Sequence, residues 1–181
     1  GKNNTYVEVN TMNTSFKFIF ITLASVLFIP SAYAALDTVI TSNFQVQITI
    51  TKTCSISSGT PITFGSVVAN TVPAKATTNL NVTCSKGTPY TIGLQPSNSS
   101  TTGAGNMSGT GSNGDKIAYQ LYSDSNGATI WGNTASGTPN IVSGTGQGSS
   151  QPVAVYAGVA NTNFTPDTYT DTVTVTVTFT Y

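Results

Sequence analysis

Two acidic residues near the end of the chain come closest to a catalytic arrangement. Asp167 and Asp171 flank Tyr169, and two carboxylates can cleave a glycosidic bond when they face each other across a cleft. Asp at the start of a strand, however, commonly caps a turn by accepting hydrogen bonds from the nearby backbone. Because both residues precede a strand-like run, we expect turn capping here and predict that the protein is not an enzyme.

Other groups that could support catalysis, metal binding or cofactor binding are scarce. The chain has no His, and its six basic and six acidic residues give a net charge of zero. From residue 35 onward there is no Arg or Glu either, so we expect no catalytic residue, metal site or cofactor. The balance of charge gives no electrostatic reason for nucleic-acid binding. The charged residues from 35 onward are Lys52, Lys75, Lys86, Lys116, Asp37, Asp115, Asp124, Asp167 and Asp171.

Residues 12–34 have the three parts of a secretory signal peptide. Lys17 lies in a short first region, an apolar stretch follows over residues 18–29, and Ala32-Tyr33-Ala34 fits the small-x-small cleavage pattern. The alternative is a transmembrane anchor, but the apolar stretch has only about a dozen residues and a transmembrane helix needs roughly 20. Residues 1–11 have no periodicity, and we interpret them as an upstream extension or an expression remnant. We therefore predict an exported protein whose mature chain starts at Ala35.

Cys54 and Cys84 are the only cysteines. Because the predicted signal peptide directs the chain to an oxidising compartment, we predict a disulfide between them. The alternative is two buried free thiols, since two thiols without His are too few for a structural zinc site. On the chain-entropy model, a bond that closes a loop of about 30 residues stabilises the fold by about 3.6 kcal/mol.

The mature chain consists of strand-like runs separated by polar, glycine-rich connections. No segment has the apolar period of an amphipathic helix, so the pattern favours an all-β fold with one core. The predicted strands are residues 40–50, 61–69, 77–84, 89–95, 116–122, 128–131, 151–159 and a final run from about Tyr169. Residues 96–115 and 132–151 are predicted to be loops, either simply solvated or placed on the outer surface of an assembly.

The two ends of the mature chain carry the most regular alternation. One face of the first run holds Ile40, Phe44, Val46, Ile48 and Ile50, and one face of the last run holds Val173, Val175, Val177, Phe179 and Tyr181. A nearly uncharged, proline-free strand is an aggregation hazard if its edge stays open, so something must cover it. One possibility is that the two runs are the first and last strands of an ordinary sandwich within one molecule.

Several segments together resemble a known family. They are TCSISSGTPITFGSV, LNVTCSKGTPYTIGL, IAYQLYSDSNGATIWG, VAVYAGV and PDTYTDTVTVTVTFTY. The pattern resembles the spore coat protein U domain family, which includes the pilins of archaic chaperone-usher systems. Two departures fall at strand ends: Asp167 replaces an expected Gly before Tyr169, and Gln95-Pro96 replaces an acidic residue and Gly.

The resemblance implies an incomplete immunoglobulin-like sandwich that lacks its final strand and is completed by a partner's strand. Residues 35–52 would then be a donor strand segment and residues 53–181 the pilin domain. The face from Val173 to Tyr181 would edge the groove that holds first a periplasmic chaperone and then another subunit. Ile40, Phe44, Val46, Ile48 and Ile50 would be the donor side chains.

This interpretation predicts a structural pilin subunit that polymerises head to tail by donor-strand exchange. Its partners would be a periplasmic chaperone, an outer-membrane usher and other copies of itself or related pilins. The product would be an extracellular fimbria for attachment and biofilm formation. Two alternatives remain from the sequence: a self-contained secreted coat protein, and a carbohydrate-binding adhesin at a fimbrial tip.

Overall fold

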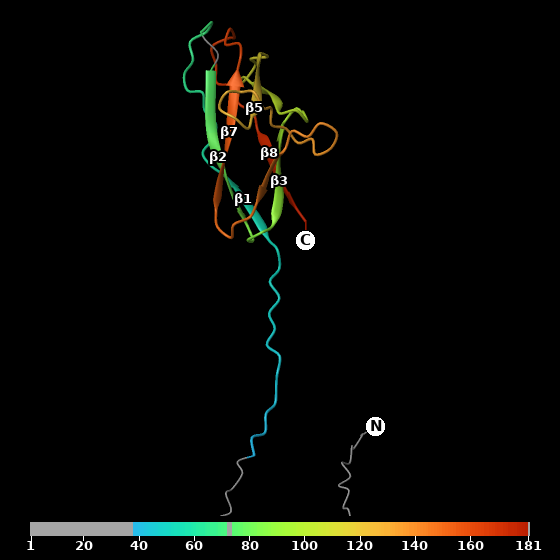
Figure 1. The fold of residues 1–181 in the computed structure, drawn as a ribbon. Helices are drawn as coiled ribbons and strands as arrows, with labels where there is room; N and C mark the ends of the chain where they lie inside the picture. Colours follow the sequence, from blue (N-terminus) through green and yellow to red (C-terminus); the bar gives the residue numbers. More distant parts are fainter. Residues whose placement is uncertain (1–37, 72–73, 181) are drawn as a thin grey trace, which may run out of the picture. The chain divides into compact units, whose positions relative to one another are not determined.

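The computed structural model describes residues 38–71 and 74–180. The chain divides into one unit that ends at Val46 and a second that runs from Gln47 to Tyr181, and each is considered by itself. Every strand of the described residues lies in the second unit (Figure 1). The predicted signal peptide, residues 1–11 and Tyr181 lie outside the described residues. Among the residues that are described, no helix has the length and apolar character needed to cross a membrane.

Within the described residues, eight strands form two antiparallel sheets. The strands are β1 (Cys54–Ser58), β2 (Ala74–Cys84), β3 (Pro89–Pro96), β4 (Ala104–Ser108), β5 (Lys116–Tyr122), β6 (Val142–Thr145), β7 (Gln151–Val159) and β8 (Val173–Phe179). One sheet has the order β1-β2-β7-β5-β4 and the other has the order β6-β3-β8. This arrangement confirms the all-β, immunoglobulin-like sandwich expected from the alternating runs.

The core lies between the inward faces of the two sheets. Its buried side chains follow the two-residue period of strands, and they are Leu80, Val82, Tyr90, Ile92, Leu94, Tyr119, Leu121, Val155, Ala157 and Val159, together with Cys84 and Trp131. Trp131 is fully buried, and its Nε1–H donates a hydrogen bond of 2.9 Å to the carbonyl oxygen of Ile92. The indole therefore buries its apolar rings while its polar group keeps a partner.

The domain has two opposite ends, which we call the base and the top. At the base, Cys54 pairs with Cys84 and Tyr90 pairs with Phe179, so β1 starts where β8 ends. The base comprises residues 52–54, 84–90, 144–148 and 179–180. The top comprises residues 62–71, 108–115 and 160–170. Two contacts bring these segments together: the pairing of Ala74 with Val159 and the bridge between Ser108 and Thr170. In Figure 1 the top is the upper end of the domain.

The predicted strands are partly confirmed. The runs at residues 116–122 and 151–159 match β5 and β7, and those at 77–84 and 89–95 lie within β2 and β3. The prediction of a strand at residues 61–69 is wrong, because that segment has no ladder partner within the described chain. Residues 40–50 also have no ladder partner there, and their pairing with another copy stays a prediction. Residues 128–131 contribute only a bridge between Ile130 and Tyr122.

The prediction of two uninterrupted loops is also wrong, because each contains a strand. β4 lies within residues 96–115 and β6 within residues 132–151. Both strands carry a glycine opposite a tyrosine, Gly105 across from Tyr119 and Gly144 across from Tyr90. A Cβ on either glycine would lie within 2.5 Å of the tyrosine ring, so the missing side chain makes room for the ring across the sheet.

Candidate functional site

The last strand, β8, lies at the edge of the smaller sheet. It pairs with β3 on one side, and it is the terminal strand in the order β6-β3-β8. Along the other side, from Val173 to Thr178, none of the strands formed by the described residues continues the ladder. β1, the terminal strand of the larger sheet, also approaches β8. β1 and β8 approach each other without a ladder between them, and we call this unpaired boundary between the two sheets the gap.

The inward face of β8 is apolar but incompletely covered. Val173, Val175, Val177 and Phe179 pack against the core and remain partly exposed, whereas the threonines between them are exposed. In β3, on the covered side, Ile92 and Leu94 are almost completely buried. The predicted groove residues from Val173 to Phe179 thus share one face, and that face lacks the cover that a further strand would supply.

A cavity of about 570 Å³ lies at the top of the domain. Its lining includes Ile62 and Phe64 from the segment before β2, Phe164 and Tyr169 from the segment after β7, and Met107 and Ile117 from the larger sheet. Ile62 and Phe64 also pack against the core from a segment without regular structure. Residues 61–69 were predicted to form a strand because apolar and polar residues alternate. In the structure this alternation belongs to a partly buried wall of the cavity.

Asp167 fixes the far side of the cavity to the connection between β4 and β5. Its carboxylate accepts hydrogen bonds from the Thr110 backbone N–H (2.7 Å), the Thr110 hydroxyl (2.5 Å) and the Asn113 side chain (2.8 Å). It also accepts one from the Thr168 N–H. The Thr110 hydroxyl, followed by Asn113, holds the pKa of Asp167 well below its ordinary value, because hydrogen bonds to a carboxylate favour its charged form.

Asp115 makes a similar connection from the opposite side of the top. Its Oδ2 accepts a hydrogen bond of 3.0 Å from the Thr165 N–H, and the Thr165 side chain is the largest cause of its lowered pKa. Nearby, the Tyr169 hydroxyl accepts from Asn113 and donates to the carbonyl oxygen of Thr165. These bonds confirm the structural role predicted for Asp167, whose side chain also lines the cavity.

Asp171 joins the two sheets at the start of β8. Its Oδ2 accepts a hydrogen bond of 2.6 Å from the Tyr119 hydroxyl, and its Oδ1 accepts from the Ser97 hydroxyl and from the Thr172 N–H. Burial, followed by the neighbouring Asp171, raises the pKa of Tyr119 above its ordinary value. Asp171 therefore caps a turn, as predicted, and also fixes the position of β8 relative to β5.

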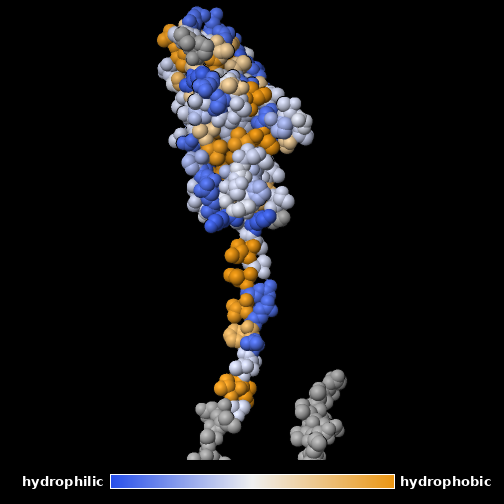
Figure 2. All heavy atoms as spheres, in the orientation of Figure 1, coloured by the Kyte–Doolittle hydropathy of each residue, from blue (hydrophilic) through white to orange (hydrophobic). Residues whose placement is uncertain are grey.

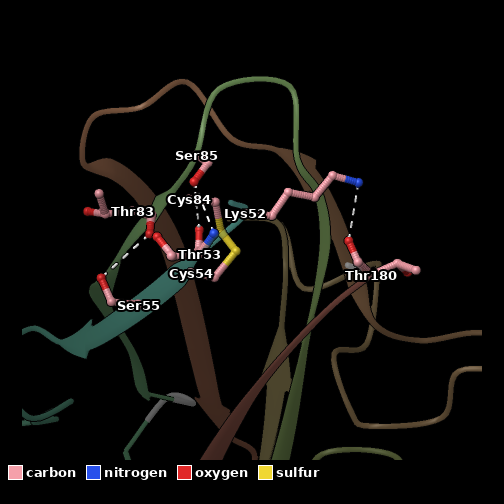
Figure 3. The surroundings of a disulfide bond; sticks show 8 residues. All are labelled: Lys52, Thr53, Cys54, Ser55, Thr83, Cys84, Ser85 and Thr180. Atoms are coloured by element: carbon pink, nitrogen blue, oxygen red, sulfur yellow. Dashed lines mark hydrogen bonds between the residues drawn. A yellow bond between two sulfur atoms is a disulfide. The ribbon is translucent and has the colours of Figure 1, made fainter. Parts of the chain in front are cut away.

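At the base, a disulfide joins Cys54 and Cys84, as predicted (Figure 3). It lies between the first residue of β1 and the last residue of β2. Two further bonds hold this corner, from the Thr53 N–H to the Ser85 hydroxyl (3.0 Å) and from the Ser85 N–H to the Thr53 carbonyl (2.9 Å). Lys52 donates a hydrogen bond of 3.4 Å to the carbonyl oxygen of Thr180. Covalent and polar contacts thus hold the start of β1 beside the end of β8 at the base.

The predicted donor residues are exposed. The side chains of Ile40, Phe44, Val46, Ile48 and Ile50 have between 83% and 90% of their surface accessible, and Figure 2 shows such apolar side chains in orange along the extended segment. Ile48 and Ile50 belong to the same unit as the sandwich, yet neither is buried in it. A contiguous set of large exposed apolar side chains is typical of a surface that binds a partner.

A family model for the spore coat protein U domain matches residues 40–176. The match covers most of the sequence, from Ile40 in the exposed segment to Thr176 in β8. The chain belongs to the spore coat protein U domain family. The match therefore includes the exposed residues 40–50 and β8 up to Thr176.

Two solved structures are similar to this spore coat protein U domain. One is a CsuC-CsuE chaperone-tip adhesion subunit pre-assembly complex from the archaic chaperone-usher Csu pili of Acinetobacter baumannii, with 23% identity and a TM-score of 0.49. The other is a chaperone-tip adhesin complex of CFA/I fimbriae, with 10% identity and a TM-score of 0.48. Each alignment covers 71% of this chain, which spans 40% and 42% of those chains. No curated protein matches the sequence.

The two departures from the spore coat protein U pattern have local explanations. Among the described non-glycine residues, those with a positive φ are Asn70 and Ser99. Asp167 therefore has a backbone conformation that does not require glycine. Its carboxylate instead supplies the bonds to Thr110 and Asn113 described above. Pro96, at the end of β3, is buried, and its carbonyl oxygen accepts the Ser99 N–H at 3.0 Å in a tight turn.

Proposed function

We propose that the protein is a structural subunit of a chaperone-usher fimbria. In this proposal the gap beside β8 accepts the segment at residues 35–52 of another copy, and the copies form a head-to-tail filament on the cell surface. A periplasmic chaperone occupies the gap before assembly, and an outer-membrane usher exports the subunits. The filament serves attachment and biofilm formation. One observation carries the proposal: a single chain contains both an incompletely covered apolar strand edge and an exposed segment with matching alternation.

The acceptor side offers both backbone and side-chain interactions. An added strand beside β8 would pair with the ladder edge between Val173 and Thr178, which is the general mode of β-strand addition. Its inward side chains would cover Val175 and Val177 and then enter the cavity at the top. Extended residues 40–50 are about 36 Å long, whereas β8 itself is about 23 Å long. The remaining length is available to lie along the cavity walls at Ile62 and Phe64.

The donor side supplies enough apolar surface for a strong joint. Burying a Val, Ile or Phe side chain contributes roughly 1.5–3 kcal/mol, and five such side chains are exposed in the segment. Part of this gain offsets the loss of freedom on association. The polar residues between them, which include Gln45 and Gln47, would face outward beside the exposed threonines of β8.

The direction of the added strand follows from where β1 and β8 meet. The donor segment leads directly into β1, which starts at the base of the same copy. The base of the donating copy must therefore lie close to the carboxyl end of its donor segment. In the antiparallel orientation to β8, the segment ends at the top of the acceptor, which brings the donating base to the accepting top. Repetition of this heterologous contact produces an open filament. A segment parallel to β8 would instead bring two bases together and favour a closed pair.

The direct test compares residues 35–181 with a shortened chain, residues 51–181, after periplasmic expression. We expect the shortened chain to be unstable alone and to gain a higher unfolding midpoint when a peptide of residues 38–52 is added. A peptide with Ile48→Asp should fail to raise the midpoint, because the charge would have to enter the apolar gap. The matched control peptide carries Gln47→Asp on the outward face and should retain binding.

The self-contained coat protein makes the opposite prediction. If the shortened chain were soluble, monomeric and unchanged in its unfolding midpoint without any partner, residues 35–50 would have no role in completing the fold. A tip adhesin would instead bind a carbohydrate array with the long connections between strands. Binding to such an array in the absence of polymerisation would contradict the role of a filament-forming subunit.

A further inference from the structure

The connection between the donor segment and β1 is too short to separate neighbouring copies. This argument rests on the proposed function. Residues 51–53 link Ile50 to Cys54, whose position at the base the disulfide to Cys84 fixes. Four residues of extended chain reach at most about 14 Å. Once Ile50 of one copy lies in the gap of another, the base of the donating copy must therefore lie against the top of the accepting copy.

The top presents an apolar turn at the rim of the cavity. Val67 lines the cavity, and the adjacent Val68 is 74% exposed. Two hydrogen bonds to the carbonyl oxygen of Val68 hold the turn, from the Thr71 N–H at 3.2 Å and from the Thr71 hydroxyl at 2.7 Å. Figure 2 shows apolar surface at this end of the domain. An apolar side chain that is held outward at the rim is a contact point for whatever covers the top.

The turn has little freedom to withdraw Val68 from the surface. Asn70 has a positive φ of 62°, a conformation that Asn tolerates better than most residues. The Thr162 hydroxyl also donates to the carbonyl oxygen of Thr71 at 3.4 Å, which connects the turn to the segment after β7. The exposure of Val68 is therefore built into the local backbone.

The few charges of the domain are distributed unequally between its two ends. The top carries Asp115 and Asp167 and no basic side chain among its described residues, and Lys116 and Asp171 directly follow two of its segments. The base carries Lys52 and Lys86, and the described residues of the base include no acidic side chain. Lys75 lies beside the top, at the second position of β2, where it donates to the carbonyl oxygen of Asn126 at 3.1 Å. Opposite charge at facing surfaces favours one relative orientation over others.

We propose that the top of the domain is a second binding surface for the base of the neighbouring copy, in addition to the donor-strand gap. In this contact Val67 and Val68 of one copy touch the base of the neighbouring copy. Asp115 and Asp167 of the first copy face Lys52 and Lys86 of the neighbour. The contact sets the angle between successive copies, whereas the donor strand sets their connection. The occupant is a second copy of this chain, because the short link brings that surface to the top.

Photo-crosslinking of the full-length protein tests this surface directly. Val68 is replaced by the photoreactive residue p-benzoylphenylalanine, and polymers are collected and irradiated. We expect crosslinks between neighbouring copies, and mass spectrometry should map them to base residues 52–54, 84–88 or 146–148. The same photoreactive residue at Ser125, in the turn that Lys75 contacts, serves as the control and should give few crosslinks between copies.

A charge reversal at the base provides a second measurement. Lys86→Glu should lower the crosslink yield from position 68 by about two- to fivefold, the effect of an exposed charge pair, while the same charge placed at the exposed Ser125 (Ser125→Glu) leaves the yield unchanged. Polymers that resist SDS but give no crosslinks at the base would overturn the second surface and leave the proposed function intact. If the unsubstituted protein formed no polymers, the second surface and the proposed function would both be overturned. A closed pair of copies crosslinked base to base would also overturn both.

Discussion

The hydroxyl of Tyr119 donates a hydrogen bond of 2.6 Å to Asp171 Oδ2, which connects β5 in the larger sheet to the residue that precedes β8 by two positions. The Tyr119 ring is almost entirely buried beneath β4. The same carboxylate accepts from Ser97 at the end of β3. Asp171 therefore sets where β8 begins along the edge of the smaller sheet.

Replacing Tyr119 with Phe should destabilise the domain by about 1–2 kcal/mol at neutral pH, because Asp171 loses a partner within the fold. Urea unfolding of the full-length protein measures the change. Since the pKa of Tyr119 is raised above the ordinary tyrosine value, the free energy of unfolding of the unsubstituted protein should fall as pH rises above about 10. Tyr119→Phe should lack this part of the fall, and an identical alkaline slope would contradict the assignment.

Acid should weaken the connection between Asp167 and Thr110. The pKa of Asp167 is lowered in the folded state, so its stabilising effect is present above the unfolded value of about 3.8 and is lost as pH falls through the folded value. Thr110→Val removes the largest cause of the lowered pKa. We expect the unfolding midpoint of this variant to decline less steeply between pH 5 and pH 2 than that of the unsubstituted protein.

An equal acid slope in the two proteins would show that Thr110 does not set the charge state of Asp167. Thr102→Val is a suitable control, because the Thr102 hydroxyl contacts Ser100 and no carboxylate among the described residues. This control should keep the full acid slope.

Removal of the disulfide should free β1 from its fixed place beside β2. Cys54→Ser with Cys84→Ser should lower the free energy of unfolding by about 3.6 kcal/mol on the chain-entropy model. Since β1 also borders the gap beside β8, we further expect weaker binding of the peptide of residues 38–52. Chemical denaturation and fluorescence anisotropy measure the two effects. Unchanged peptide affinity would indicate that β1 contributes nothing to the bound state.

Ile48→Asp in the full-length chain should abolish SDS-resistant polymers while leaving the gap able to bind a partner strand. The substitution places a charge among the donor side chains but leaves β8 unaltered. The variant should therefore still accept the peptide of residues 38–52, as detected by native mass spectrometry. Gln47→Asp, on the opposite face, is expected to polymerise normally. Normal polymers from Ile48→Asp would mean that the even-numbered residues are not the donor face.

Alternation of residue types was sufficient to predict the strands that bury one face. β5 and β7 have the predicted bounds because Tyr119, Leu121, Val155 and Ala157 alternate with more exposed residues. The disulfide and the capping by Asp167 and Asp171 were also predictable, since both depend on local chemistry and compartment. Those features need no knowledge of how distant segments are arranged.

The remaining features depend on long-range packing that composition does not encode. β4 has little apolar character, and it pairs with β5 because Gly105 leaves room for the Tyr119 ring. Residues 61–69 alternate like a strand, yet Ile62 and Phe64 line a cavity and have no ladder partner in the described chain. The sequence alone could not distinguish a strand from a cavity wall, because both bury every second residue.

The disulfide at the base also determines how the domain responds to mechanical load. Tension that arrives through residues 47–53 meets Cys54 first, and the bond to Cys84 passes it to β2 without stretching β1 away from its neighbour. β2 in turn is hydrogen-bonded along most of its length to β7. These ladder bonds run perpendicular to the strands and would be sheared together. Forced extension is governed by the unfolding rate, so the covalent bond directs tension past the weaker edge strand.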